Sequence, residues 1–352
     1  MKLIKYLTIC ALILNSQFST LNSLSAQTSD YRIANRFHLE GNEGWDYIAA
    51  DDNAARLYIS HSSMVQVLDA AKGTVLGAIS DLHGVHGIAV ATDMGKGFIS
   101  SGKDSSVVVF DLLNFKTLAK IIVTGANPDA IVYDQMSHRV FTFNGRSSNA
   151  TVIDANTNKV IGTIGLDGKP EFAVVDGEGK MYVNIEDKSK ITIINIASMK
   201  VESSYSIAPG DEPSGLAIDT KTHRLFSVCD NKLMVISDYK KGEVIATMPI
   251  GDHPDGVAFD KGLQRAYSSN GEGNITVVQE MDANKFKVTE TIPTQNGART
   301  LCLNEKNHHL YLPTAEMLPP TEMPPNKPAP AKKSQVKPGT FVILDVEYVK
   351  HK

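Results

Sequence analysis

Seven polar side chains recur at nearly equal intervals along the chain, and their types are those that bind ions or take part in acid–base chemistry. Four are carboxylates, and the others are an imidazole, a hydroxyl and a guanidinium. In chain order they are Asp46, His86, Asp129, Glu171, Ser214, Asp255 and Arg299. The intervals between neighbours are 40, 43, 42, 43, 41 and 44 residues. If one type of element places them around a common axis, the carboxylates there will raise one another's pKa or attract a cation.

Three roles for these residues follow from their chemistry. Carboxylate oxygens suit Ca²⁺ or Mg²⁺, and His86 would also permit Zn²⁺ or Mn²⁺, so a divalent cation is a candidate cofactor. A carboxylate or His86 could serve as a general base while Arg299 holds an anionic or carbonyl oxygen. The third role is structural, because a short polar residue after proline can bond the backbone of its turn, and duplication of a repeat copies that turn. The sequence leaves these roles open, and with them the question whether the protein is an enzyme.

The residues lie at the start of copies of one repeat. Segments 125–134, 210–219 and 251–260 each begin with glycine, have proline at the fourth position and continue as an apolar strand that ends in aspartate. A second polar column closes the third strand expected in each copy, at Asp69, Asp111, Asp154, Asn195, Ser237, Gln279 and Asp345. Strands rich in β-branched residues, in a unit of about 42 residues, are typical of a four-stranded propeller blade. The sequence therefore predicts an all-β, seven-bladed β-propeller.

The two ends of the chain are expected to share one blade. The seventh repeat supplies three strands, near Leu301, Leu310 and Val342, and has no fourth. Segment 31–39, which precedes the first repeat, has the pattern of the missing strand, and pairing it there would close the ring. The seventh repeat also holds an insertion, residues 316–339, rich in proline and lysine, which we expect to be a stiff rim over the ring, a docking arm or a tolerated surface loop.

Residues 1–26 have the features of a secretory signal peptide. Lys2 and Lys5 precede a short apolar stretch, and Ala26 ends a small-residue cleavage pattern. This predicts a mature chain of residues 27–352 that forms a single propeller domain in the periplasm or outside the cell. That chain has 33 Lys and Arg against 39 Asp and Glu, a net charge of −6, so we expect no nucleic-acid binding. No later apolar run is long enough to predict a transmembrane segment.

Several strands resemble the YVTN-type repeat of the YncE-like seven-bladed propellers. The resemblance is carried by Ala150-Thr151-Val152-Ile153-Asp154 followed by Lys159-Val160-Ile161-Gly162-Thr163-Ile164, and by the strands at 65–69 and 106–111. It covers nearly all of the mature chain except the proline-rich insertion. It implies the propeller fold and says little about function, since this family includes members of unknown role, surface-layer proteins and relatives among propeller lactonases.

Two functional hypotheses follow. In the first, the protein is an exported binding or scaffold propeller whose polar ring meets a small molecule, a glycan or a protein at the channel mouth. In the second, it is a metal-assisted hydrolase of the lactonase type that uses the same ring. Cys229 and Cys302 fall in different repeats, so we expect no disulfide between them.

Overall fold

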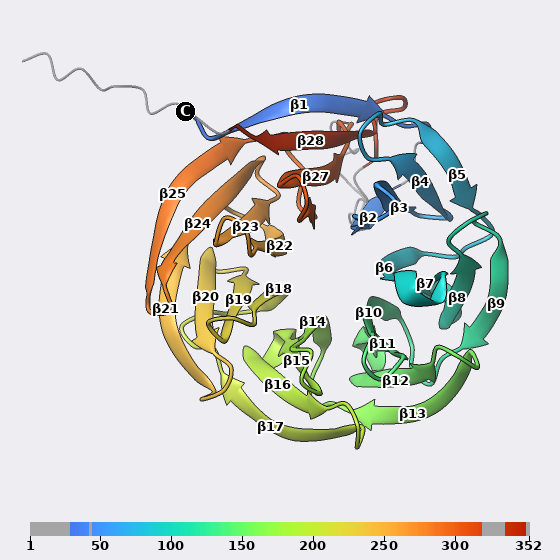
Figure 1. Cartoon of the computed structure of the whole chain (residues 1–352), viewed down its shortest axis with the longest axis horizontal. Helices are drawn as coiled ribbons and strands as arrows, with labels where there is room; N and C mark the ends of the chain where they lie inside the picture. Colours follow the sequence, from blue (N-terminus) through green and yellow to red (C-terminus); the bar gives the residue numbers. More distant parts are fainter. Residues whose placement is uncertain (1–28, 42–43, 319–334, 350–352) are drawn as a thin grey trace, which may run out of the picture.

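The computed structural model describes residues 29–41, 44–318 and 335–349. Over these residues the chain forms seven four-stranded antiparallel sheets, arranged radially as the blades of a propeller around a central channel (Figure 1). The predicted all-β, seven-bladed fold is confirmed. The predicted signal peptide, residues 1–26, lies outside the described residues, as does the middle of the 316–339 insertion.

The two inner strands of each blade surround the channel. The innermost strands are β2 (Trp45–Asp51), β6 (Val85–Ala91), β10 (Pro128–Asp134), β14 (Pro170–Val175), β18 (Pro213–Asp219), β22 (Pro254–Asp260) and β26 (Cys302–Asn304). The second strands are β3 (Arg56–His61), β7 (Lys96–Ser101), β11 (Arg139–Asn144), β15 (Lys180–Ile185), β19 (Arg224–Cys229), β23 (Arg265–Asn270) and β27 (His309–Thr314).

The two outer strands of each blade complete the sheet. The third strands are β4 (Met64–Asp69), β8 (Ser106–Asp111), β12 (Asn149–Asp154), β16 (Lys190–Asn195), β20 (Leu233–Asp238), β24 (Asn274–Asp282) and β28 (Val342–Tyr348). The outermost strands are β5 (Val75–Ile79), β9 (Thr117–Ile122), β13 (Lys159–Gly165), β17 (Lys200–Ser206), β21 (Glu243–Pro249), β25 (Lys285–Pro293) and β1 (Tyr31–His38). Short 3₁₀ turns are η1 (Thr92–Met94), η2 (Gly102–Asp104), η3 (Gly145–Ser147) and η4 (Glu186–Lys188).

The chain ends close the ring as predicted. β1 is the outermost strand of the last blade and pairs antiparallel with β28, from Tyr31 opposite Tyr348 to His38 opposite Val342. Figure 1 shows β1 lying along β28, so the first and last described strands belong to one sheet. The pairing covers an edge of β28 that would otherwise expose unpaired backbone groups.

The second strand of each blade carries an aromatic side chain at its third position. This side chain fills the space between neighbouring blades. These residues are Tyr58, Phe98, Phe141, Tyr182, Phe226, Tyr267 and Tyr311, and each is at most 1% exposed. Large buried aromatic side chains contribute much of the hydrophobic stabilisation of a core. Because each repeat supplies one such aromatic side chain, an apolar layer forms at each interface between blades.

A basic side chain begins the second strand of each blade, and several of these side chains link one blade to the next. Arg56 donates to the carbonyl of Leu112 in the following blade at 2.5 Å, and Lys96 donates to the carbonyl of Ala155 at 2.8 Å. Arg224, which is 5% exposed, donates to the carbonyl of Ala283 at 2.6 Å and pairs with Asp238 at 3.0 Å. These contacts satisfy carbonyl groups in the turns between third and outermost strands.

The second polar column predicted from the sequence is wrong at three of its positions, one of which is Gln279, since β24 continues to Asp282. Register places Asp238 rather than Ser237 opposite the basic residue that starts the second strand, because Arg224 pairs with Asp238. In the last blade Leu310 pairs with Val346, so Asp345 lies inside β28 rather than at its end. Elsewhere the column acts as expected: the carboxylate of Asp69, for example, accepts backbone N–H groups in the turn that follows it.

Two further expectations concern the membrane and the cysteines. Among the described residues, no helix is long and apolar enough to cross a membrane. Cys229 and Cys302 are both free thiols, and Cys229 is buried. The expectation that they form no disulfide is confirmed.

Candidate functional site

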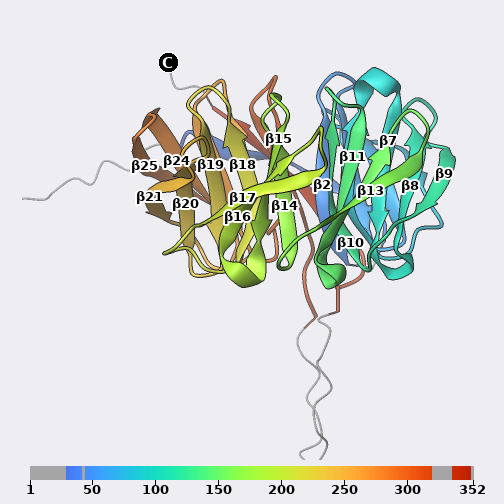
Figure 2. The ribbon, with the colours of Figure 1, turned by 90° about the horizontal axis from the view of Figure 1, so that it is seen from below.

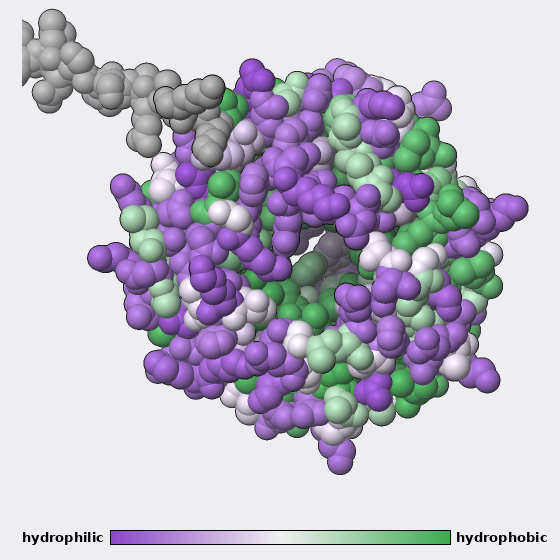
Figure 3. Space-filling view, in the orientation of Figure 1, coloured by the Kyte–Doolittle hydropathy of each residue, from purple (hydrophilic) through white to green (hydrophobic). Residues whose placement is uncertain are grey.

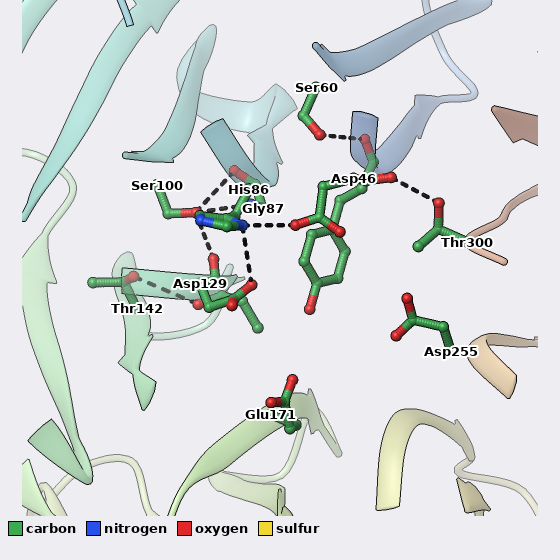
Figure 4. A network of polar contacts seen from close by, with 12 residues as sticks. Asp46, Ser60, His86, Gly87, Ser100, Asp129, Thr142, Glu171, Asp255 and Thr300 are labelled. Carbon is green, nitrogen blue, oxygen red and sulfur yellow. Dashed lines mark hydrogen bonds and ion pairs between the residues drawn. The ribbon is translucent and has the colours of Figure 1, made fainter. Parts of the chain in front are cut away.

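The seven predicted residues take equivalent places at the start of the innermost strands. Six of them are the second residue of their strand, from Asp46 in β2 to Asp255 in β22, and Arg299 lies three residues before β26. Figure 4 shows Asp46, His86, Asp129, Glu171 and Asp255 around one opening. We call the seven residues the mouth ring: Asp46, His86, Asp129, Glu171, Ser214, Asp255 and Arg299.

Glycine at the third position of some innermost strands lets neighbouring strands approach closely. A Cβ atom on Gly87 would lie 2.8 Å from the carbonyl oxygen of Asp129, and one on Gly215 would lie 2.6 Å from that of Asp255. Distances this short are prohibited for a real Cβ, so only glycine allows the approach. The local sequence thus helps to bring successive ring residues near one another.

His86 lies between two carboxylates of the ring. Its Nδ1 is 2.6 Å from Oδ2 of Asp46 and 3.7 Å from Oδ1 of Asp129. Burial lowers the pKa of His86, but the hydrogen bond to Asp46 and the negative charges of Asp129 and Asp46 outweigh it and raise the pKa above its usual value. Burial raises the pKa of Asp129 to about 6, although the charge of His86 opposes this rise.

Arg299 spans the next part of the ring. Its Nη2 is 3.4 Å from Oδ1 of Asp46, and its Nη1 pairs with the carboxylate of Asp255. The guanidinium, which comes from the blade that closes the propeller, therefore pairs with two ring carboxylates of the neighbouring blades. Its side chain is 42% exposed, which leaves part of it accessible to a ligand.

Glu171 belongs to a second charged group in the blade of β14. Lys169 contacts it at 2.5 Å and also pairs with Glu186, at the start of η4. Burial and a hydrogen bond to Glu186 raise the pKa of Glu171 to about 8, against the opposing effect of Lys169. Burial lowers the pKa of Lys169, but its bonds to both glutamates raise it overall.

Ser214 is the ring member that makes a backbone contact. Its hydroxyl donates to the carbonyl of Pro254, in the next blade, at 3.0 Å. This resembles the structural role that the sequence left open, except that the bonded backbone belongs to the neighbouring blade rather than to the turn of Ser214 itself.

The channel below the ring is apolar. A cavity of about 360 Å³ is lined by the innermost strands of all seven blades, including Tyr47, Ile131, Phe172, Leu216 and Val257. Figure 3 shows hydrophobic residues inside a central opening whose surroundings are largely hydrophilic. A molecule with an apolar body and a polar group could therefore contact the channel and the ring at once.

Tyr47 links the ring to the channel. Its ring stacks on that of Phe172, with centroids 5.8 Å apart. Burial, and then the charges of Asp129 and Asp46, raise its pKa well above the usual value, so its hydroxyl stays protonated.

The stem of the insertion forms a wall beside the ring. Met317 and Val336 form an antiparallel bridge, and Leu318 N–H donates to the carbonyl of Gln335 at 2.8 Å. Figure 2 shows the two sides of this stem leaving the propeller at one face. A groove of about 640 Å³ lies between the stem and the ring, lined by Trp45, Arg299, Met317, Leu318, Val336 and Pro338 with their neighbours. The described ends of the insertion therefore lie beside Arg299 of the mouth ring, and the middle of the insertion lies outside the described residues.

Sequence reasoning missed Lys169 and Tyr47. Lys169 stands just before the proline of β14, two residues from Glu171. A lysine so close in the sequence could have indicated an ion-pair partner for Glu171. Tyr47 follows Asp46 directly, but alternation along a strand would place it on the opposite face. In β2 the pairing register shifts between Trp45 and Ile48, and such an irregularity breaks strict alternation.

These observations define the chain as a seven-bladed β-propeller. The uncharacterized YncE proteins of Salmonella typhi and of Salmonella typhimurium (strain LT2) are each 26% identical to this chain over 149 residues. The match spans 40% of this chain and 42% of each relative, so it covers less than half of their length. The resemblance to YncE-like propellers is thereby confirmed as a distant one. No protein-family model matches the chain.

Solved structures share the fold at low sequence identity. Hydrazine synthase of Kuenenia stuttgartiensis has a TM-score of 0.68 at 18% identity, over 78% of this chain and 94% of that one. U3-55K and the WD40 repeats of RRP9 each have a TM-score of 0.74 at 8% identity, over 90% and 91% of this chain and 98% of theirs. At these identities the similarity concerns the architecture of the propeller alone.

Proposed function

We propose that the protein is an exported propeller that binds a small molecule, with the polar part of the ligand at the mouth ring and its apolar part in the channel. The observation that carries this proposal is the position of the charged ring directly over an apolar cavity of about 360 Å³. Ligand sites are commonly apolar cavities with a few convergent polar groups and shifted pKa values. The signal-like residues 1–26 support export to the periplasm or the medium.

A fluorescent apolar probe tests the channel. N-Phenyl-1-naphthylamine should bind one site per chain, with an increase in emission, because its aromatic body suits the apolar lining. Replacing Phe172 by Asp should weaken binding by about tenfold or more, since a carboxylate would enter the apolar wall. Fluorescence titration measures both.

The matched control lies on the outside of the molecule. Ile122, on β9, is 66% exposed and remote from the channel lining, so Ile122→Asp should leave the titration unchanged. No emission change with the wild-type protein, or equal weakening by both variants, would contradict a ligand site in the channel.

A second candidate is a metal-assisted hydrolase of the lactonase type. It is favoured by one observation, the pKa of about 6 that burial gives Asp129 beside His86, because such a carboxylate could take a proton from water near neutral pH. Hydrolysis of γ-butyrolactone that is lost in Asp129→Asn would favour this candidate over simple binding. The net charge, −4 for the full sequence and −6 for the predicted mature chain, continues to argue against nucleic acid as a partner.

A further inference from the structure

We propose that Asp46, His86 and Asp129 bind a first-row divalent metal ion, Zn²⁺ or Mn²⁺, at the mouth of the channel. This inference rests on the proposed function, because the ion would hold the polar part of the ligand there. Among the described residues, these three form the group of His, Cys, Asp and Glu side chains placed to hold an ion, with one ligand atom from each lying within 4.8 Å of the others.

The distances between the ligand atoms of Asp46, His86 and Asp129 are close to those around a bound metal ion, so small shifts of the side chains would let them bind one. With metal–ligand bonds of about 2.1 Å, neighbouring ligands lie about 3.0 to 3.4 Å apart in octahedral or tetrahedral sites. Nδ1 of His86 is now 2.6 Å from Oδ2 of Asp46 and 3.7 Å from Oδ1 of Asp129. An ion between them would replace the proton that His86 shares with Asp46 and would bring Asp129 closer.

The donor set selects the class of metal. One imidazole nitrogen and two carboxylate oxygens suit first-row divalent ions, whereas Ca²⁺ and Mg²⁺ prefer oxygen alone. Three protein ligands leave at least one coordination position for water or a ligand oxygen.

Charge at the mouth also favours a cation there. The ring and its neighbour Glu186 contribute five carboxyl groups, against the cationic groups of His86, Lys169 and Arg299. Lys169 forms ion pairs with Glu171 and Glu186. Arg299 forms ion pairs with Asp46 and Asp255. The carboxylate of Asp129 forms an ion pair with His86, whose Nδ1 lies 3.7 Å from its Oδ1.

Hydroxyl groups fix the backbone of the three proposed ligands. Ser100 Oγ donates to the carbonyl of Asp129 at 2.5 Å and accepts from the N–H of Gly87, which follows His86, at 2.8 Å. Thr300 Oγ1 donates to the carbonyl of Asp46 at 2.7 Å. Figure 4 shows these bonds around the ring. Such outer contacts hold ligand residues in place before a metal arrives, as in other metal sites.

Metal titration of the chelator-treated protein tests the inference. Zn²⁺ followed by calorimetry, and Mn²⁺ followed by the loss of its free electron paramagnetic resonance signal, should each show one ion per chain. His86→Ala and Asp129→Asn should each weaken binding by about tenfold or more, since even outer-contact changes in metal sites cost 10- to 100-fold. Circular dichroism and thermal unfolding establish that each variant is folded.

The control uses a surface cluster of the same residue types. His138 lies 3.5 Å from Asp93 and is hydrogen-bonded to Tyr133, so His138→Ala tests adventitious binding. It should leave the titration unchanged. Absence of binding by the wild-type protein, binding unaffected by His86→Ala, or loss of binding in His138→Ala would each overturn the inference.

The naphthylamine titration separates this inference from the proposed function. If the probe binds in chelator and no ion binds at His86, the metal inference fails and the ligand site stands. If an ion binds through His86 and the probe does not bind, the metal site stands and the channel part of the proposed function fails.

Discussion

Replacing Tyr31 by Ala should destabilise the protein by about 3 to 5 kcal/mol, because it removes the side chain that anchors the closing strand. Tyr31 is 4% exposed and packs edge-on against Tyr267, with ring centroids 5.8 Å apart. Its hydroxyl lies 2.8 Å from that of Tyr267 and accepts a hydrogen bond from Arg265, also at 2.8 Å. Truncation would leave a cavity, and the buried hydroxyl of Tyr267 and the partly buried guanidinium of Arg265 would lose this partner.

Two further variants separate the parts of this effect. Tyr31→Phe keeps the ring and loses the hydroxyl, so its cost should be about 1 to 2 kcal/mol. Arg36→Ala, at an exposed position of the same strand, should change the free energy of unfolding by less than about 0.5 kcal/mol. Urea denaturation measures all three. A Tyr31→Ala protein as stable as wild type would mean that β1 does not close the ring.

Replacing Glu280 by Gln should stabilise the protein increasingly as pH rises from about 4.5 to about 7. Glu280 is 4% exposed, and neither carboxylate oxygen has a hydrogen-bond partner of ordinary geometry among the described residues. Burial raises its pKa to about 7, and the nearby Asp219 adds to this rise while Thr222 and Arg224 oppose it.

The sign of the pH dependence follows from proton binding. Between pH 4.5 and 7 the folded protein holds a proton on Glu280 that the unfolded chain has released, so wild-type stability falls as pH rises through this range. The amide of Gln cannot ionise, so Glu280→Gln lacks this loss, which amounts to at most about 3 kcal/mol for a shift of this size. Urea denaturation across the pH range measures it.

An exposed glutamate provides the comparison. Glu243→Gln, on β21, should give a pH profile of stability parallel to that of the wild type. If Glu280→Gln also runs parallel to the wild type, or is less stable than it at pH 8, Glu280 is not the strained carboxylate described here.

The blade count and the position of the ring could be predicted because each depends on spacing. Successive residues from Asp46 to Arg299 lie 40 to 44 apart, and the fold converts equal spacing into equivalent places on successive blades. The closing strand was also predictable, since the seventh repeat visibly lacks its fourth strand and segment 31–39 has the required pattern.

Side-chain contacts outside the repeated positions were beyond the reach of the spacing. Nothing in the sequence pairs Lys169 with Glu186, because they meet through a turn whose geometry depends on η4. The pairing register of the outer strands also escaped detection, since it places Asp238 opposite Arg224 and Val346 opposite Leu310, and the predicted column had Ser237 and Asp345 instead. The isolation of Glu280 depends on which polar groups fail to reach it, which no pattern along one strand records.

Anomalous X-ray diffraction from crystals grown with Zn²⁺ or Mn²⁺ would test the functional use of the mouth ring most directly. The account predicts one strong anomalous peak per chain, within about 2.0 to 2.3 Å of Nδ1 of His86 and of carboxylate oxygens of Asp46 and Asp129. An unoccupied ring in crystals whose metal peaks lie at surface histidines such as His138, or side chains of Asp46, His86 and Asp129 that point away from one another, would contradict it.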